Sequence, residues 1–214
     1  MLPAMVSAVA ACHGSPMSFF DRLPPAPPPE PEPPRPAWMK PEAALAGVVA
    51  KELLLARTDH AAIAITGLLA YRTGFEFILS AVLRREDRRG RMFDPGLLHW
   101  PGRHDEPLPA EFLRLGVQFA DGRVATNLER PPFPPPDAEP AGPLLLPDGG
   151  GGGGRRYDMR YWVWPLPPPG PVAFVCQWPA HDIPESRVEI DARLILDAAA
   201  RAIGLWPEDG QGSD

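Results

Sequence analysis

Apolar and polar residues alternate with a period of two along much of the chain, which is the pattern of strands that bury one face. The clearest cases are two pairs of segments, 61–70 with 75–84 across Thr73-Gly74, and 112–119 with 124–128 across Asp121-Gly122. Glycine after a polar residue favours tight hairpin turns, so each pair predicts an antiparallel hairpin. Further strands are expected within residues 48–58, 144–146, 155–164, 172–178 and 187–191.

The densest apolar and aromatic stretch extends from residue 155 to residue 191. Within it, residues 165–171 (PLPPPGP) cannot continue a strand ladder, because proline has no backbone N–H and its φ is fixed. One strand therefore ends near Trp164 and the next begins near Val172, and we expect the two to pair as a central hairpin. A loop symmetric about Pro168 would place Trp164 opposite Val172, Trp162 opposite Phe174 and Arg160 opposite Cys176.

Neither face of this expected hairpin is plainly polar, so each face needs a covering layer. Residues alternate between faces along a strand. One face would carry Asp158, Arg160, Trp162, Trp164, Val172, Phe174, Cys176 and Trp178, and the other Met159, Tyr161, Val163, Ala173 and Val175.

Residues 192–205 have apolar positions at helical spacing, with charged residues opposite them. Asp191 suits the N-cap, and Pro207 ends the helix. We expect the helix to cover Trp162 and Trp164 by contacts from Leu194, Ala198, Ala202 and Trp206. If the helix lies elsewhere, the two tryptophans would form an exposed apolar patch.

About eight short strands and one terminal helix predict a mainly β fold, an antiparallel β-sandwich with the C-terminal helix packed on it; an open β-barrel is the alternative. We expect residues 1–44 to be a disordered proline-rich arm, residues 45–207 one domain, and residues 208–214 a disordered tail. The arm contains a polyproline II spacer (residues 24–36), which buries little apolar area. Removal of residues 1–40 is therefore expected to change the melting temperature by only a few degrees.

The 214-residue chain has a net charge of −6 and no basic block, which argues against nucleic acid as a partner. Its pairs Arg84-Arg85 and Arg88-Arg89 are interpreted as a solvated turn. No apolar run approaches the ~18 residues of a membrane helix, so no membrane partner is expected. A lipobox-like VAAC ends at Cys12, but no Lys or Arg precedes it. We expect a cytoplasmic protein that starts near Met17, with a lipoprotein anchored at Cys12 as the alternative.

Asp158 and Arg160 are the charged residues expected beside Trp162 and Trp164, and Trp178 lies on the same expected face. Two interpretations remain open. The five side chains line a ligand-binding cleft, or the two charges form a cross-strand pair at the solvated end of the sheet. These five are the candidate binding residues, and no catalytic residue is assigned.

Other candidate sites have weaker patterns. No standard metal-ligand spacing is formed by His99, His104 and His181 with Asp94, Asp105 and Asp182, so no metal or other cofactor is expected. Cys176 lies on an apolar strand and is interpreted as a small buried hydrophobe rather than a nucleophile. The six glycines 149–154 are interpreted as a flexible loop, because phosphate-binding loops are followed by a helix or by a Lys and a Ser/Thr.

Four segments carry a resemblance: GFEFILSAVLRR, LRLGVQFADGRVATN, YWVWPLPPPGPVAFVCQWP and IPESRVEID. Over roughly residues 45–206 the chain resembles a recurring family of uncharacterised bacterial proteins. A bacterial source with a GC-rich genome also fits the composition, in which Lys40 and Lys51 are the only lysines. The resemblance implies one cytoplasmic domain and brings no activity or ligand with it.

Two functions of different class remain. The first is a non-enzymatic binding or scaffolding domain, with an unidentified protein or small molecule as its partner. The alternative is a protein that binds or acts on a small molecule or carbohydrate through a tryptophan-lined cleft with Asp158 and Arg160. Exposed tryptophans would favour the cleft, and buried tryptophans would favour the binding domain.

Overall fold

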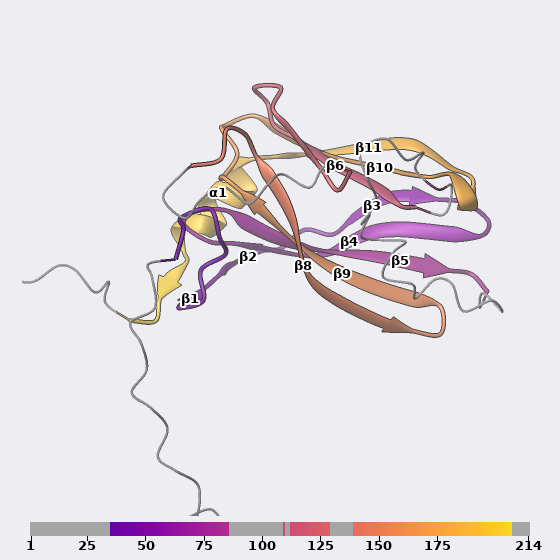
Figure 1. The fold of residues 1–214 in the computed structure, drawn as a ribbon, viewed down its shortest axis with the longest axis horizontal. Helices are drawn as coiled ribbons and strands as arrows, with labels where there is room; N and C mark the ends of the chain where they lie inside the picture. The colour runs from indigo at the N-terminus through magenta and orange to yellow at the C-terminus, as the bar shows by residue number, and fades with distance from the viewer. Residues whose placement is uncertain (1–34, 86–108, 110–111, 129–138, 207–214) are drawn as a thin grey trace, which may run out of the picture. The chain divides into compact units, whose positions relative to one another are not determined.

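The computed structural model describes residues 35–85, 109, 112–128 and 139–206. All of them belong to one compact unit, which begins at Arg35. The twelve strands in these residues form two antiparallel sheets and a short two-stranded ribbon, accompanied by one α-helix. The two sheets lie one over the other in Figure 1. The predicted antiparallel β-sandwich with one C-terminal helix is confirmed, and neither sheet closes into a barrel.

The larger sheet has six strands in the order β2–β4–β5–β9–β8, with β3 also paired to β4. Their bounds are β2 Gly47–Val49, β3 Leu53–Arg57, β4 Ala61–Ala70, β5 Phe75–Leu83, β8 Leu144–Gly153 and β9 Arg156–Trp164. The smaller sheet has four strands in the order β11–β10–β6–β7. Their bounds are β6 Arg114–Gln118, β7 Val124–Thr126, β10 Pro171–Trp178 and β11 Ile183–Asp191. A 3-10 turn, η4 (Pro179–His181), connects β10 to β11.

The two hairpins expected from local turn chemistry are confirmed. β4 and β5 pair from Ala70 opposite Phe75 to Ala61 opposite Leu83. β6 and β7 pair across the Asp121-Gly122 turn, in which Gly122 has a φ of 85° and the Asp121 carboxylate accepts a hydrogen bond from the Arg123 backbone N–H.

The predicted central hairpin is wrong, because β9 and β10 lie in different sheets. β9 is hydrogen-bonded between β5 and β8, and β10 between β6 and β11. The proline segment between Trp164 and Pro171 therefore carries the chain from one layer of the sandwich to the other. Each strand has two apolar faces, so each can be a central strand of its own sheet, and the proline loop supplies no tight turn that would pair them.

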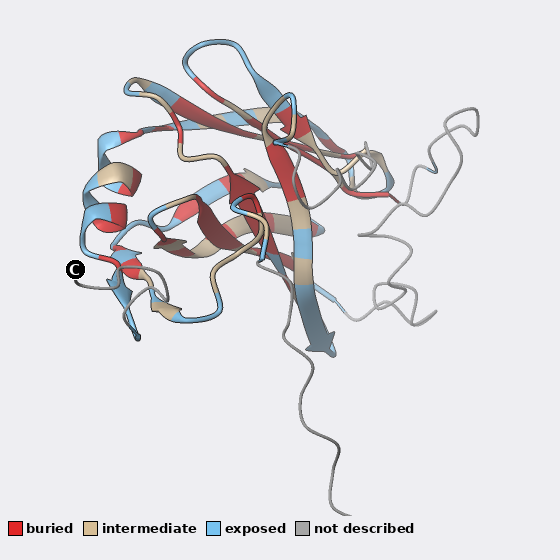
Figure 2. Cartoon of the chain, turned by 60° about the vertical axis from the view of Figure 1, so that its left-hand side comes forward, coloured by how far each residue is buried: buried red, intermediate tan, exposed pale blue. Residues whose placement is uncertain are grey.

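The sandwich interior is formed by alternate residues of both sheets. From β9 it receives Tyr157, Met159, Tyr161 and Val163, and from β10 Val172, Phe174, Cys176 and Trp178. The ring of Phe77 joins the layers, since it stacks on Tyr161 at 5.6 Å between centroids and meets Phe174 edge-on at 5.3 Å. Trp162 and Trp164 point to the opposite, outer side of their sheet, so they do not share a face with the apolar residues of β10. Figure 2 shows the buried residues gathered between the sheets.

Helix α1 (Arg193–Ala200) is shorter than the predicted span 192–205. The predicted N-cap is wrong by one residue, since Ala192 takes that place without a side-chain cap. Asp191 precedes it, and its carboxylate accepts a hydrogen bond from the Arg193 backbone N–H at 2.9 Å. The helix packs on β2 and β4, where Gly47 approaches it so closely that a Cβ would lie 1.9 Å from the Ala198 carbonyl oxygen. The predicted contact set is half wrong: Ala198 and Ala202 are buried, whereas Leu194 and Trp206 are exposed.

The helix stops early because the chain after it becomes extended. Residues Ile203–Gly204 form β12, which pairs with β1 (Ala44–Leu45) in a short ribbon. Trp206 follows this ribbon and is 74 % exposed, so it cannot cover the tryptophans of β9.

The glycine run is a strand rather than the expected flexible loop. β8 continues from Leu144 through Gly153, and its glycines pair with the first residues of β9. Gly154, with a φ of 63°, and Arg155 form the two-residue turn. A Cβ on Gly152 would lie 2.2 Å from the Arg156 carbonyl oxygen, so this hairpin requires glycine there. In Figure 2, β8 changes from buried at its start to exposed along the glycines.

Candidate functional site

Trp162 and Trp164 belong to an outer tryptophan cluster on the six-stranded sheet, formed by Trp38, Tyr71, Leu144, Trp162 and Trp164. Both tryptophans of β9 are buried, at 2 % and 7 % exposure. The Trp162 indole N–H donates to the backbone carbonyl of Trp38 at 2.9 Å, and the Tyr71 ring meets Trp162 edge-on at 5.6 Å. Burial of these side chains was expected, but their cover is not the C-terminal helix.

The cover is the N-terminal strap, which we define as residues 35–46. It places Trp38 in the cluster at 5 % exposure, and Met39, Ala44 and Ala46 pack against it. The predicted boundary of the disordered arm at residue 44 is therefore too far along the chain. The sequence did not predict the strap, because Trp38 comes two residues after the end of the polyproline II spacer and has no periodic pattern around it.

Lys40 fixes the strap to the sheet. Its ammonium donates hydrogen bonds to the carboxylates of Glu76 on β5 and of Asp148 on β8, the latter at 2.7 Å. Partial burial disfavours the charged ammonium, but the hydrogen bonds to Asp148 and Glu76 outweigh it, so the pKa of Lys40 is raised above its usual value. Burial also raises the pKa of the neighbouring Tyr71 hydroxyl, and the charge of Glu76 adds to this shift.

We expect Lys40→Met to destabilise the protein by about 3 kcal/mol, because it leaves the buried Glu76 carboxylate without its cation. The double variant Lys40→Met/Glu76→Leu should recover most of this loss, since an apolar pair in the same place carries no desolvated charge. Urea unfolding of Lys40→Met, of Glu76→Leu and of the double variant measures the coupling free energy between the two side chains. Additive losses would show that Lys40 and Glu76 do not act as a pair.

Asp158 and Arg160 are not paired with each other. The Asp158 carboxylate accepts hydrogen bonds from the Ser80 hydroxyl at 2.6 Å and from Arg156 Nε at 2.9 Å. Arg160 is exposed, and its Nε donates to the Asp148 carbonyl at 3.3 Å. The expected charge pair therefore lies along one strand, between Asp158 and Arg156, rather than across two strands.

The structure does not bring the five candidate residues together in one cleft. Trp162 and Trp164 lie under the strap, whereas Trp178 lies in the sandwich interior on the other sheet at 2 % exposure. The Trp178 ring contacts the His181 ring at 4.0 Å between centroids. Asp158 and Arg160 are left on the outer face of the six-stranded sheet without a tryptophan surface beside them.

Of the other candidate residues, some lie within the described part of the chain and some lie outside it. Cys176 faces the interior, and burial raises the pKa of its thiol to about 11, which keeps it protonated and unreactive. His99, His104, Asp94 and Asp105 lie outside the described residues. Among the described residues, no three His, Cys, Asp or Glu side chains gather as a metal site. The helix that the structure describes is too short to cross a bilayer.

A groove lies on a different surface of the sandwich, and none of the five candidate residues lines it. The outer face of the four-stranded sheet holds a groove of about 330 Å³, which we call the sheet-face groove. It is lined by Arg114, Leu115, Gly116, Val117, Gln118, Val124, Thr126, Leu128, Val175, Cys176, Gln177 and Glu185. The register places Gly116 between Val175 of β10 and Thr126 of β7, so the groove follows from the missing side chain at the middle of three strands.

Polar side chains border the apolar floor of this groove on two sides. On one side the Arg114 guanidinium donates to the Gln177 side-chain carbonyl at 2.6 Å. On the other, Arg187 donates to the side chains of Gln118 at 2.7 Å and Glu189 at 2.8 Å. The Arg114 Nε–H is buried and finds no hydrogen-bond partner among the described residues. An apolar floor with a few fixed polar groups at its edges is the usual composition of a binding site.

Sequence reasoning placed the outward positions of β6 correctly but did not find the groove. The alternation in 112–119 predicts Arg114, Gly116 and Gln118 on the outer face, as observed. The groove also needs the residues that flank Gly116 on β7 and β10, and their register is set by contacts far apart in the sequence. An isolated glycine within an alternating strand was the available signal, because it marks a place where something approaches the backbone closely.

The chain was compared with protein-family models, with curated proteins and with solved structures, and none of the three comparisons gave a match.

Proposed function

We propose that this protein is a non-enzymatic binding domain that holds a partner protein through the sheet-face groove. The observation that carries the proposal is the apolar hollow over Gly116, bordered by charged side chains of both signs. Val124 at its border is 50 % exposed although it belongs to a strand of the sandwich. An apolar floor surrounded by a polar rim is the composition of a protein–protein interface core.

The chemistry of the groove supports binding rather than catalysis. Its arginines already donate to neighbouring carboxamides and a carboxylate, which fixes their position for recognition. The one thiol in its lining, Cys176, points into the sandwich interior and stays protonated. A general base beside a free nucleophile, which hydrolytic and transfer enzymes need, does not occur among the lining residues.

The size of the groove indicates what part of the partner enters it. A volume of about 330 Å³ accommodates one large apolar side chain with its backbone, rather than an extended cofactor. Such a side chain would act as the anchor of the interface, and Arg114, Arg187 and Glu185 would form its polar rim. The alternative, a tryptophan-lined cleft, is not supported, because Trp162, Trp164 and Trp178 are all buried.

A photo-crosslinking amino acid at Val124 tests the proposal in the host cell. The matched control is the same amino acid at Leu194, which is similarly exposed (44 %) but lies on α1. We expect a discrete adduct from position 124 and none from position 194. The captured protein is then produced separately, and its Kd for the purified chain is measured.

Gly116→Leu fills the groove and gives the decisive comparison. A Cβ at position 116 meets only ordinary contacts, at 3.6 Å to the Ala125 carbonyl oxygen and 3.7 Å to a Thr126 methyl carbon, so the fold should tolerate the change. We expect the Kd to weaken at least tenfold (about 1.4 kcal/mol) with an unchanged melting temperature. An unchanged Kd for Gly116→Leu, or equal adducts at positions 124 and 194, would contradict the proposal.

A further inference from the structure

The end of the sandwich where β5 finishes brings together arginines from distant parts of the sequence. Arg84 and Arg85 follow β5, and Arg155 lies in the turn between β8 and β9. Antiparallel pairing sets the end of β5 beside the start of β9, and the Leu83 backbone N–H donates to the Arg155 carbonyl. The Arg155 guanidinium in turn donates to the Arg84 carbonyl at 3.0 Å. We call these three residues the arginine end.

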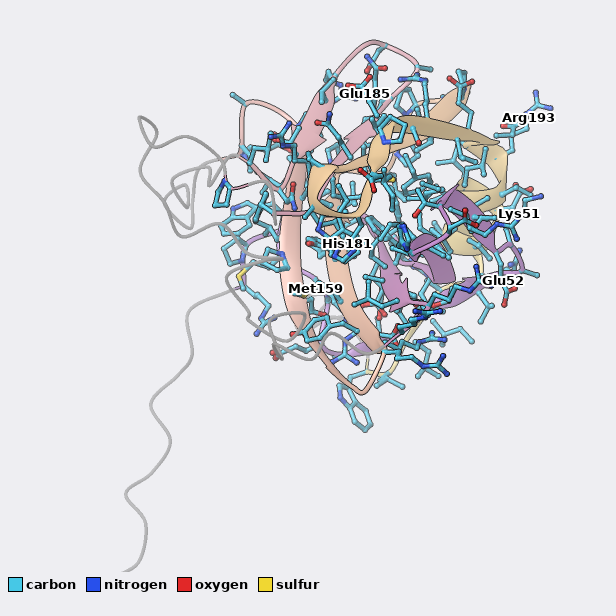
Figure 3. The ribbon with its side chains drawn as sticks, turned by 90° about the vertical axis from the view of Figure 1, so that its right-hand side faces the viewer. Lys51, Glu52, Met159, His181, Glu185 and Arg193 are labelled. Carbon is cyan, nitrogen blue, oxygen red and sulfur yellow. The ribbon has the colours of Figure 1, made fainter. Side chains whose placement is uncertain are left out.

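A cavity of about 540 Å³ opens at the same place. It is lined by Asp59, His60, Leu83, Arg84, Arg85 and His181. Figure 3 looks onto this end of the sandwich, and His181 lies near the centre of the view. Its position is fixed, because its ring contacts Trp178 at 4.0 Å and its carbonyl accepts a hydrogen bond from the Thr58 hydroxyl at 3.2 Å. Three segments thus line the cavity with two arginines and two histidines, together with Asp59 and Leu83.

Among the described residues, Asp59 is the one carboxylate that lines this cavity beside the two arginines. Arg84 lies 3.8 Å from Asp59, and both side chains are largely exposed, so this ion pair is loose and easily exchanged for a ligand. Arg85 and Arg155 make no ion pair within the described part of the chain. Within the residues that the structure describes, arginines therefore outnumber carboxylates at the cavity, although the net charge of the chain is −6.

We propose that the cavity at the arginine end binds the phosphate group of a small molecule. Guanidinium groups donate pairs of hydrogen bonds that match the oxygens of a phosphate, and imidazole N–H groups of His60 and His181 supply further donors. The site is separate from the sheet-face groove, since none of its lining residues is shared. The protein therefore carries a ligand site in addition to its protein-binding surface.

A polyanion such as nucleic acid would need a different surface. Binding to a phosphate backbone requires several neutralised phosphates along a strip, whereas the arginines here, Arg84 and Arg85, line one cavity. A phosphate-bearing small molecule also suits a cavity of about 540 Å³ better than a duplex does. The test must therefore distinguish binding of a small phosphate ligand from binding of nucleic acid.

The test uses the whole 214-residue chain, with inorganic phosphate as the probe. Phosphate is titrated at constant ionic strength against chloride while the imidazole signals of His60 and His181 are followed by NMR. We expect saturable shifts of these two signals with phosphate and none with chloride. Arg84→Gln/Arg85→Gln should weaken the apparent Kd at least about tenfold, because it removes charge-assisted donors while leaving the backbone hydrogen bonds intact.

Arg193→Gln is the matched control, because Arg193 is an exposed arginine on α1 outside both sites. It should bind phosphate like the unchanged protein. Non-saturable shifts, shifts that the double variant retains, or an equal loss in Arg193→Gln would each overturn the proposal. So would a 20-base-pair DNA duplex that binds more tightly than phosphate and depends on the same two arginines.

Discussion

Trp162→Ala is expected to lower the free energy of unfolding by about 3–5 kcal/mol, the cost of truncating a large side chain in a packed core. Trp162 is 2 % exposed, contacts the Tyr71 ring, and donates its indole N–H to the Trp38 carbonyl. The substitution removes all three contributions and leaves a cavity under the N-terminal strap. Urea unfolding followed by circular dichroism measures the loss.

Trp206→Ala is the control for this measurement. Trp206 is 74 % exposed, so its truncation should change the free energy of unfolding by less than about 0.5 kcal/mol. In acrylamide quenching of single-tryptophan variants, Trp206 should be strongly quenched and Trp162 protected. A Trp162 that is quenched as readily as Trp206, with little loss of stability on truncation, would restore the tryptophan cleft as a binding site.

Deletion of residues 1–40 is expected to lower the melting temperature by about 10 °C or more. The deletion removes Trp38 from the outer tryptophan cluster and Lys40 from the buried Glu76 carboxylate. Each loss alone costs about 3–5 kcal/mol, and a combined loss of only 4 kcal/mol would shift a domain of this size by roughly 8–16 °C. This reverses the small effect expected from the proline-rich composition.

Deletion of residues 1–34 is the matched control, because it leaves the strap in place. It should shift the melting temperature by no more than a few degrees. The difference between the two deletions therefore reports the contribution of the six residues from Arg35 to Lys40. Equal shifts for the two deletions would show that the strap does not stabilise the sandwich.

The sequence predicted those parts of the fold that depend on neighbouring residues. The hairpin between β4 and β5 and the one between β6 and β7 are each specified by alternation and by a glycine turn within a few residues. The start of α1 is predicted to within one residue, since Asp191 lies just before the observed N-cap Ala192 and accepts a hydrogen bond from the Arg193 backbone N–H. The sandwich class follows from the number and spacing of such strands.

The pairing of β9 and β10 could not be read in the same way. Alternation fixes which residues of a strand share a face, but it does not say which strand lies beside it. Both strands are apolar on both faces, so nothing in their composition distinguishes a hairpin from two central strands in separate sheets. The proline loop allows either arrangement sterically, and the partners that decide it, β5 for β9 and β6 for β10, lie far away in the sequence.

The candidate sites failed or succeeded for the same reason. The prediction of a tryptophan-lined cleft required β9 and β10 to lie in one sheet. They lie in different sheets, so the predicted cleft is absent from the described residues. The sheet-face groove depends on Gly116, Val175 and Thr126, which come from three strands and meet only through the correct register. Asp158 and Arg156 form a pair along one strand, which a search for cross-strand partners overlooks.

The two outer faces of the sandwich differ in a way that bears on function. On the six-stranded sheet, the protein covers its own tryptophans with the strap. On the four-stranded sheet, small side chains leave an apolar hollow that the described residues do not fill. A partner is therefore expected at β6, β7 and β10, and not at β9.

Hydrogen–deuterium exchange, with and without the protein captured through Val124, tests this assignment most directly. The partner should slow exchange in residues 114–118 and 124–126 and leave residues 156–164 unchanged. Gly116→Leu should reduce that protection at the same partner concentration. Protection of residues 156–164 with no change over β6 and β7 would contradict the placement of the binding surface on the four-stranded sheet.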